Sequence, residues 1–317
     1  MAVAHFQPIR GLQNAHVQTV LGVVLRGSAF PHRTVRRLVT LPDGDRLVLH
    51  DTRPRNWGST DPIALLLHGI GGSHRSGPVV RLARMLYRRG VRVVRLDLRG
   101  AGAGLPLARR TYHAGCSADV RAALEAIHRL EPDAPICLSG ISLGGNVALK
   151  LAGEAAAPPG LSRVAVVAPP VDLAACLNRI SHRKNRFYDR YFVGGLLAEA
   201  RRRERLFPEL RLPPLPRPMT LRLFDELLTA PRGGFRDAAD YYAQSSSGPF
   251  VTNIGVPTLI LAARDDPFVD PEPIERLARP PCVGIQMTDH GGHVGYLGGA
   301  QLYWGEQTLA DWLCDSQ

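Results

Sequence analysis

Ser142 lies at the centre of a Gly-x-Ser-x-Gly motif, Gly140-Ile141-Ser142-Leu143-Gly144, between an apolar run and a helix-like run. A buried strand, a sharp turn with serine at its apex and a following helix form a nucleophile elbow, which exposes the serine hydroxyl. Strain at the apex requires very small residues two positions away, and Gly140 and Gly144 meet this requirement. The alternative is a glycine-rich turn with an unreactive serine. The flanking strand and helix favour a catalytic serine.

A serine hydroxyl needs an adjacent base, and histidine suits this role because its pKa lies near neutral pH. His293 follows the last strand-like run, and the two glycines before it allow the loop to bring its imidazole to Ser142. We therefore favour His293 over His290 as the base. The spacing His290-Gly-Gly-His293 also resembles a pair of metal ligands, but no third ligand is evident nearby. We predict neither a metal ion nor a cofactor.

A carboxylate must hold the histidine in the correct tautomer and stabilise its charged form. Asp265 and Asp266 follow a strand-like run, and the chain order serine, acid, histidine is the one expected after such an elbow. We favour Asp266 because Pro267-Phe268-Val269 follow it directly, in a turn from which the carboxylate can point back into the site. Asp265 is then expected to cap this loop or the next helix.

Two backbone N–H groups are candidates for stabilising an oxyanion. The N–H of Leu143 lies at the start of the helix after the serine, and the N–H of Ile70 lies in the glycine-rich loop 68–72 after an earlier strand-like run. His68 is expected to support this loop rather than to react.

Two aspartates follow other strand-like runs. Asp97, together with Arg99 and the glycines that follow, resembles a structural turn. Asp172 resembles a helix cap, with a catalytic role as the alternative. The glycine spacing at positions 100, 102 and 104 does not fit a dinucleotide-binding motif, so this segment is interpreted as a flexible loop.

Apolar runs and helix-like segments alternate along most of the chain. This alternation is typical of a mostly parallel sheet with helices on both faces, whose ligands bind at the carboxyl ends of the strands. We predict a single α/β domain over residues 1–317, with about eight strands. The expected strands are 34–41, 46–51, 62–69, 91–96, the run from 136 to the elbow, 162–168, 256–262 and 283–287, and the expected helices are 79–89, 117–130, the segment after the elbow, 271–278 and 301–313.

The alternation stops between residues 171 and 253, where arginines, aromatic residues and a proline-rich segment occur without strand-like runs. We predict that residues 171–253 form a helical insertion that caps the carboxyl edge of the sheet. Residues 1–30 give neither a clear helix nor a clear strand, and we expect them to wrap around the outside of the domain.

The chain carries 39 Lys and Arg against 28 Asp and Glu, a net charge of +11. Such an excess suits nucleic acids or anionic membranes, but almost all the cations are arginines spread along the sequence, so nucleic-acid binding is not predicted. The five scattered cysteines form no Cys-x-x-Cys, which favours reduced thiols. Because no apolar stretch of about 18 residues and no secretory leader are evident, we expect a cytoplasmic protein.

Together these motifs resemble the α/β-hydrolase superfamily, and within it the YheT-like esterase branch. The resemblance implies a serine hydrolase acting on carboxylic esters, with Ser142, Asp266 and His293 as its catalytic triad. At Asp97 the sequence departs from this branch, where asparagine is expected. The matching segments span almost the whole chain in the order of the branch: residues 14–19, 67–72, 140–146, 265–268 and 290–295.

Three hypotheses follow for the function. The leading one is a serine carboxylesterase for small-molecule esters with short to medium acyl chains. The alternative is a lipase or lysophospholipase whose arginine-rich run 201–205 contacts an anionic membrane surface, although a solvated helix face explains this run more simply. The third is a non-catalytic protein that binds a ligand in the same pocket. Family membership does not fix the substrate, and the sequence predicts no oligomeric state.

Overall fold

The computed structural model describes residues 5–25, 30, 32–298 and 301–315. Within these residues, eight strands form one sheet in the order β1-β2-β4-β3-β5-β6-β7-β8. β2 pairs antiparallel with β1 and with β4, and all the other neighbours are parallel. The predicted fold class is therefore confirmed. The strands are β1 (Val35–Thr40), β2 (Arg46–Thr52), β3 (Ile63–Leu67), β4 (Arg92–Asp97), β5 (Ile136–Ile141), β6 (Leu161–Val167), β7 (Thr258–Ala263) and β8 (Val283–Thr288).

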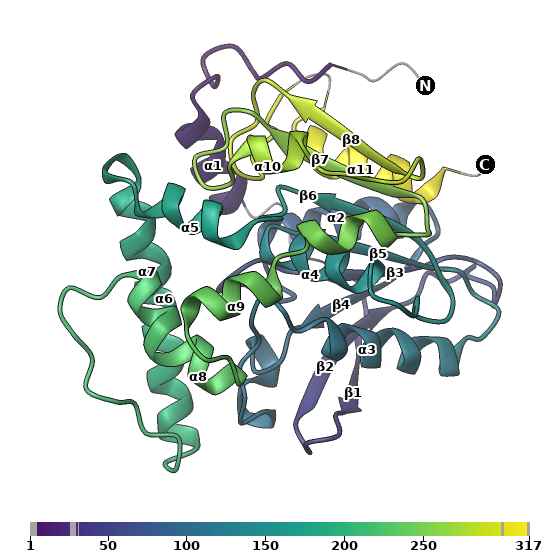
Figure 1. The fold of residues 1–317 in the computed structure, drawn as a ribbon. Helices are drawn as coiled ribbons and strands as arrows, with labels where there is room; N and C mark the ends of the chain where they lie inside the picture. Colours follow the sequence, from purple (N-terminus) through teal and green to yellow (C-terminus); the bar gives the residue numbers. More distant parts are fainter. Residues whose placement is uncertain (1–4, 26–29, 31, 299–300, 316–317) are drawn as a thin grey trace.

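Helices cover both faces of the sheet (Figure 1). α2 (Gly77–Arg88) and α11 (Trp304–Cys314) share one hydrophobic core with the sheet, whereas α3 (Ser117–Leu130) and α4 (Leu143–Ala152) belong to the core on the other side. In the central strand β3, Leu65 and Leu67 face the core on the side of α3 and α4. Leu66 faces the core on the side of α2 and α11. All of β3 is buried, which explains why its sequence is a continuous apolar run.

Residues 171–253 contain helices and turns but no strand, and every residue of this segment is described. The segment leaves the sheet after β6 and returns at β7, and these two strands are neighbours. Figure 1 shows its longest helix, α6, beside the sheet at the left of the molecule. We call this segment the insertion. Its elements are α5 (Leu173–Ser181), η2 (Arg183–Asn185), α6 (Arg186–Leu206), α7 (Leu221–Phe224), the π-helical turn η3 (Asp225–Thr229), α8 (Ala230–Gly233), α9 (Ala238–Ser245) and η4 (Gly248–Asn253).

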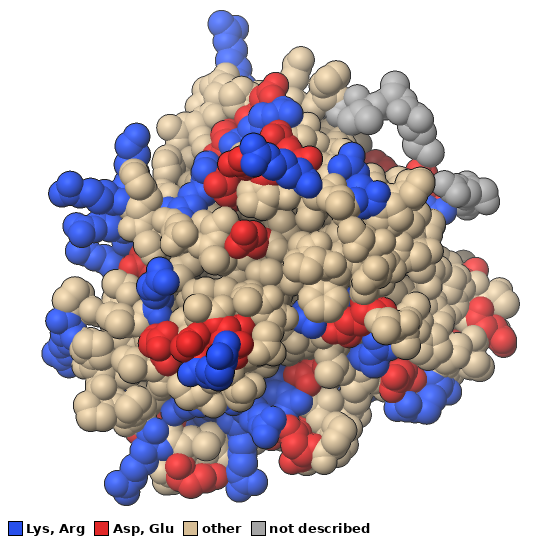
Figure 2. All heavy atoms as spheres, in the orientation of Figure 1, with Lys and Arg blue, Asp and Glu red and all other residues tan. Residues whose placement is uncertain are grey.

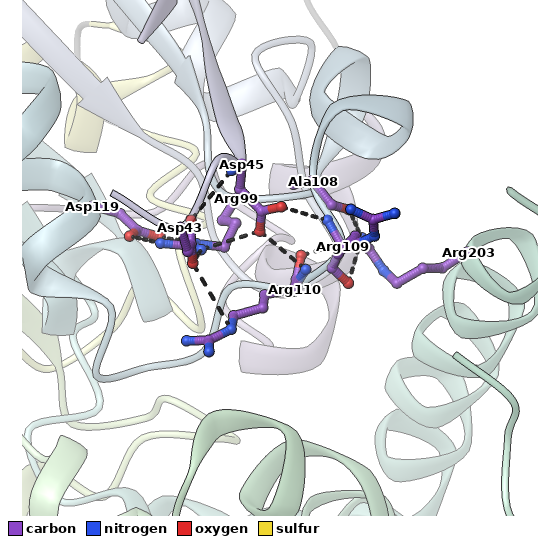
Figure 3. A network of polar contacts seen from close by, with 8 residues as sticks. All are labelled: Asp43, Asp45, Arg99, Ala108, Arg109, Arg110, Asp119 and Arg203. Atoms are coloured by element: carbon purple, nitrogen blue, oxygen red, sulfur yellow. Dashed lines mark hydrogen bonds and ion pairs between the residues drawn. The ribbon is translucent and has the colours of Figure 1, made fainter. Parts of the chain in front are cut away.

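A buried arginine of α6 binds the insertion to the sheet domain (Figure 3). The guanidinium of Arg203 donates hydrogen bonds to the carbonyl oxygens of Gly100, Ala108 and Arg110. Its side chain is only 1% exposed. The predicted arginine-rich run 201–205 is therefore not one solvated or lipid-facing row, because its central residue is directed into the protein.

The segment that receives Arg203 is itself held by the hairpin between β1 and β2. The Asp45 carboxylate accepts the backbone N–H groups of Arg109 and Arg110 at 2.8 and 3.1 Å. Arg99 pairs with Asp45 and also with Asp119 of α3 and Asp43 (Figure 3). Arg99 thus has the predicted structural role, since it pairs with three carboxylates. The network holds in place the segment whose carbonyl oxygens bind Arg203 of α6.

Two local expectations were wrong. The N-terminal segment forms a helix, α1 (Ala15–Val24), because the Asn14 side chain accepts the N–H groups of His16 and Val17 at its first turn. The expected flexible loop after β4 forms a 3-10 helix, η1 (Gly102–Leu107), whose Ala103 N–H is accepted by the Asp97 carboxylate. In each helix a side chain from outside the helix accepts a backbone N–H of the first turn.

Three further expectations concern a helix boundary, the cysteines and membrane-crossing helices. The predicted helix 271–278 is shorter in the structure, where α10 spans Pro271–Glu275. All five cysteines are free thiols, and Cys137 is buried whereas Cys282 is partly exposed. Among the described residues, no helix combines the length and the apolar character that crossing a membrane requires.

Candidate active site

Ser142 lies between the end of β5 and the start of α4, at the apex of a sharp turn. Its backbone has φ 54° and ψ −121°, a conformation that non-glycine residues rarely adopt. A Cβ on Gly140 would lie 2.2 Å from the carbonyl oxygen of Gly144, and a Cβ on Gly144 would lie 2.6 Å from that of His68. The two glycines therefore allow the strand and the helix to cross closely enough to form the elbow.

We expect Gly140→Ala to lower the free energy of unfolding by about 3 kcal/mol, because strand and helix would have to separate to admit the methyl group. Urea denaturation followed by circular dichroism measures this change. Gly284→Ala in β8 is the matched control, since its Cβ would meet only the Thr258 carbonyl oxygen, at 3.9 Å. Equal losses in the two variants would contradict the role of the close crossing.

The structure brings Ser142, His293 and Asp266 into one continuous chain of hydrogen bonds. His293 Nε2 lies 2.8 Å from Ser142 Oγ, and His293 Nδ1 lies 2.8 Å from Asp266 Oδ2. His293 and Asp266 are both buried, and Ser142 is partly exposed. With Nδ1 donating to the carboxylate, Nε2 is free to accept the serine proton, which is the arrangement that activates a hydroxyl.

The turn after Asp266 fixes the direction of its carboxylate. Its second oxygen, Oδ1, accepts the backbone N–H groups of Phe268 and Val269 at 2.7 and 3.0 Å. The Phe268 ring also packs against the imidazole of His293, with ring centroids 4.6 Å apart. Sequence reasoning predicted this turn, but it did not identify the aromatic contact that limits the motion of the imidazole.

Asp265, which follows β7, and His290, which follows β8, lie beside the site and do not join the chain of hydrogen bonds. Asp265 Oδ1 accepts the N–H of Gly292 at 2.8 Å, so Asp265 caps the loop that carries His293. The His290 side chain is about half exposed and lies 3.4 Å from Asp265. The next helix, α10, is capped by Asp270 rather than by Asp265. Asp172 caps α5 by accepting the N–H of Ala175.

Sequence reasoning missed the support that α1 gives to the histidine loop. The Thr19 hydroxyl accepts the backbone N–H of His293 at 2.9 Å. The Gln18 side chain binds both the N–H and the C=O of Leu297. Gly22 faces Gly295 so closely that a Cβ there would lie 2.7 Å from its Cα. The sequence contained the signal, since Gln18 and Thr19 are two adjacent polar residues between Val17 and Val20.

The two candidate oxyanion donors lie on either side of Ser142. Leu143 is the first residue of α4, and neither its N–H nor that of Ile70 has a hydrogen-bond partner within the described part of the chain. The neighbouring N–H of Gly71 is already donated to the Tyr112 hydroxyl at 2.7 Å. Tyr112 thus fixes the loop 68–72 and leaves the Ile70 N–H as the available donor.

His68 holds the loop 68–72 in place through its two ring nitrogens, as the sequence predicted. It is fully buried, its Nδ1 donates to the carbonyl oxygen of Gly69 and its Nε2 accepts the N–H of Leu98. A Cβ on Gly69 would lie 3.3 Å from the Cβ of Ser142. Glycine at this position therefore keeps space open beside the serine.

His50, His74 and Asp97 form the one group, among the described residues, whose side chains could hold a metal ion by their type and proximity. The two imidazole rings are stacked, with centroids 3.4 Å apart and planes 14° from parallel. Ring lone pairs lie in the ring planes, so those of stacked rings do not converge on one ion. The Asp97 carboxylate instead accepts hydrogen bonds from the imidazole rings of His50 and His74. It also accepts the backbone N–H groups of His74 and Ala103. The group fits a buried hydrogen-bond centre that fixes the end of β4.

A narrow cavity of about 50 Å³ extends from the candidate oxyanion donors beneath the insertion. Its walls combine Ile70 and Leu143 with apolar side chains of the insertion, and polar groups complete the lining. The insertion contributes the apolar residues Leu196, Ala200, Phe224 and Leu228. It also contributes the polar residues Glu199, Asp225, Thr229, Arg232 and Tyr241. The arrangement suits a small apolar group attached to a carbonyl carbon held at Ser142.

Asp225 of this lining gives the protein a pH-dependent stability. Burial raises the pKa of its carboxyl to about 6, although Thr229 and Tyr242 donate hydrogen bonds to it. Between about pH 4 and 6 the folded state keeps a proton that the unfolded chain has released, so stability falls as the pH rises through this range. We expect Asp225→Asn to remove this dependence, which is on the order of 3 kcal/mol.

Urea denaturation at pH 4, 5, 6 and 7 measures the effect. Asp133→Asn is the matched control, because Asp133 is exposed and its replacement makes the same change of charge. An Asp225→Asn variant whose stability still falls between pH 4 and 6, in parallel with the original protein, would refute this assignment.

Comparison with known proteins agrees with this fold. Residues 62–300 match the family model described as alpha/beta hydrolase fold. The chain is 34% identical, over 98% of its own length and 93% of the relative's, to the Escherichia coli (strain K12) protein named "Putative esterase YheT". The chain therefore belongs to the α/β hydrolase fold family, in the branch that contains this bacterial protein. The family resemblance seen in the sequence is confirmed.

A more distant relative and a solved structure extend the comparison. The chain is 29% identical to the Mus musculus phospholipase ABHD3 over 76% of its own length, and it spans 60% of the length of that relative. The Pyrococcus furiosus esterase Pf2001 has the same fold, with a TM-score of 0.59 and 16% identity over 90% of this chain and 93% of that one.

Proposed function

We propose that this protein is a serine carboxylesterase in which Ser142 is the nucleophile, His293 the general base and Asp266 the acid that orients it. The observation that carries the proposal is the unbroken chain of two 2.8 Å hydrogen bonds from Ser142 Oγ through His293 to Asp266. A strained elbow serine beside two unoccupied backbone N–H groups gives independent support. The similarity to the Escherichia coli relative named as an esterase agrees with this reaction class.

The first half of the reaction forms an acyl-enzyme. Ser142 Oγ attacks the ester carbonyl carbon while its proton passes to His293 Nε2. Asp266 accepts the hydrogen bond from Nδ1 and stabilises the imidazolium that results. The N–H groups of Ile70 and Leu143 stabilise the oxyanion, a contribution worth roughly 3 kcal/mol for each donor. His293 then donates its proton to the departing alkoxide, which leaves as the alcohol.

Water completes the cycle. His293 Nε2 removes a proton from a water molecule, which attacks the acyl carbon, and the same proton returns to Ser142 Oγ when the carboxylic acid leaves. The narrow cavity beside Ile70 and Leu143 supports an acyl group of short to medium length. We place the protein in the cytoplasm and its substrate among small-molecule esters.

A fluorophosphonate probe tests the proposal directly, because only an activated serine reacts readily with it. We expect covalent labelling at Ser142 by peptide mass spectrometry, together with hydrolysis of p-nitrophenyl acetate and butyrate. Absence of both labelling and hydrolysis in the folded protein would instead support the non-catalytic, ligand-binding alternative.

A lipid-directed hydrolase is the second candidate, and the similarity to a relative named as a phospholipase favours it. A series of p-nitrophenyl esters from acetate to palmitate, followed by a lysophospholipid, separates the two candidates. Highest kcat/KM on acetate or butyrate supports the carboxylesterase, whereas highest kcat/KM on the lysophospholipid supports the lipid-directed enzyme.

A further inference from the structure

Helix α1 presents its apolar residues outwards. Its buried residues are Gln18, Thr19 and Gly22, which face the loop of His293. The opposite side of the helix consists of valines that are 38% to 63% exposed: Val17, Val20, Val23 and Val24. A helix of a soluble domain ordinarily buries its apolar stripe, so this inverted arrangement leaves an apolar face that no described residue of the chain buries.

The start of α6 continues this face. His16 of α1 is hydrogen-bonded to Tyr188 of α6 at 3.0 Å, and their rings are stacked. Beside Tyr188, the rings of Phe187 and Tyr191 are 70% and 62% exposed. Figure 1 shows α1 and the start of α6 at the same end of the molecule, at its upper left.

Cations surround the exposed aromatic residues. Arg183, Lys184, Arg186 and Arg190 are all exposed, and none forms an ion pair within the described part of the chain. The nearest acidic residue in the sequence, Asp189, is buried and accepts the N–H of Leu221. In Figure 2, basic side chains project from the left edge of the molecule, at the height of the start of α6.

We propose that this surface, which we call the α1–α6 surface, docks on an anionic lipid bilayer. It consists of the four valines of α1, Phe187, Tyr191 and the four unpaired cations. Exposed aliphatic and aromatic side chains can enter the interfacial region of a bilayer while arginine and lysine bind anionic headgroups. Because the inner side of α1 binds the His293 loop through Thr19, docking brings the candidate active site next to the membrane.

The shape and charge of the surface favour a bilayer over a protein partner. The apolar side chains lie on the outer sides of two helices, and the cations are long side chains that form no ion pair with any residue the structure describes. A fluid surface of negative charge adapts to such scattered groups, whereas protein interfaces require matched shapes. The nearby cavity of about 610 Å³ does not itself select anions, because the carboxylates of Asp265 and Asp270 are also part of its lining.

Vesicle sedimentation tests the proposal with the full chain. We expect the protein to sediment with vesicles of 30% phosphatidylserine in phosphatidylcholine at 0.1 M NaCl, and to be released at 0.5 M NaCl. Arg186→Ser/Arg190→Ser is expected to weaken the partition coefficient by roughly 20-fold. Val20→Ser/Val24→Ser is expected to weaken it by roughly tenfold.

Arg201→Ser/Arg202→Ser is the matched control, because it removes the same charge from exposed positions further along α6. We expect this control to change partitioning less than threefold. Equal losses in the control and in the Arg186→Ser/Arg190→Ser variant, or no binding of the original protein to the vesicles, would overturn the proposal. Dimerisation in analytical ultracentrifugation that Val20→Ser/Val24→Ser abolishes would assign the surface to a second copy instead, and would also overturn it.

The turnover of soluble p-nitrophenyl acetate keeps this test separate from the proposed esterase activity. The surface variants are expected to retain the turnover of the original protein, since none of the changed side chains contacts Ser142, His293 or Asp266. Vesicle binding without any esterase activity would contradict the proposed function alone, and esterase activity without vesicle binding would contradict the docking surface alone.

Discussion

Replacing Ser142 with alanine is expected to reduce kcat for p-nitrophenyl butyrate by roughly 10⁶-fold. The substitution removes the only atom at the elbow apex that can form the acyl-enzyme, so hydrolysis then depends on water without a covalent intermediate. The fold should persist, because Ser142 Oγ bonds only to His293 Nε2 among the described residues. Steady-state kinetics and circular dichroism of the purified variant measure the two effects.

Ser139→Ala is the matched control for this experiment. Ser139 lies on β5, three residues before Ser142, and its hydroxyl donates to the carbonyl oxygen of Ala165 in the neighbouring strand β6. Its loss is expected to leave kcat within a few-fold of the original value. Undiminished hydrolysis by a folded Ser142→Ala variant would refute the proposed mechanism.

The second large effect is expected from Asp266→Asn, which should lower kcat by about 10⁴-fold. The amide oxygen of the new side chain can accept the N–H groups of Phe268 and Val269 as Asp266 Oδ1 does. Its NH₂ group would then face His293 Nδ1 and act as a donor. His293 would carry its proton on Nε2, and that nitrogen could no longer accept the proton of Ser142.

The neighbouring carboxylate provides the control for this prediction. Asp265 Oδ1 accepts the N–H of Gly292, and the amide oxygen of Asp265→Asn can accept the same hydrogen bond. We expect Asp265→Asn to change kcat less than tenfold. If Asp265→Asn proves the more damaging substitution, the assignment of the acid to Asp266 is wrong.

Much of the fold could be predicted because its signals are local. Buried parallel strands require continuous apolar runs, and Ile63–Leu67 shows one without interruption. The elbow requires glycines at fixed distances from Ser142, and the measured close approaches at Gly140 and Gly144 explain both. Expectations failed for two short helices whose first-turn N–H groups are accepted by a side chain, that of Asn14 for α1 and that of Asp97 for η1.

The direction of single side chains could not be predicted in the same way. The run 201–205 is arginine at every position but Glu204, yet only Arg203 is buried, where it donates to the carbonyl oxygens of Gly100, Ala108 and Arg110. The exposed valines of α1 likewise follow from the polar contacts that Gln18 and Thr19 make with a loop more than 270 residues away. Such contacts depend on segments that meet only after folding.

The reactive groups could be predicted from the residue order: a serine in a strained turn, a histidine after two glycines and a carboxylate before a proline, each placed after a strand of the sheet. Those requirements are local, because they concern the geometry of a few consecutive residues. The 2.8 Å contacts between these groups follow from the fold, since the pairing of β5, β6, β7 and β8 sets where the carboxyl ends of these strands lie. The fold also places α1 against the loop of His293, a contact between segments that lie far apart in the sequence.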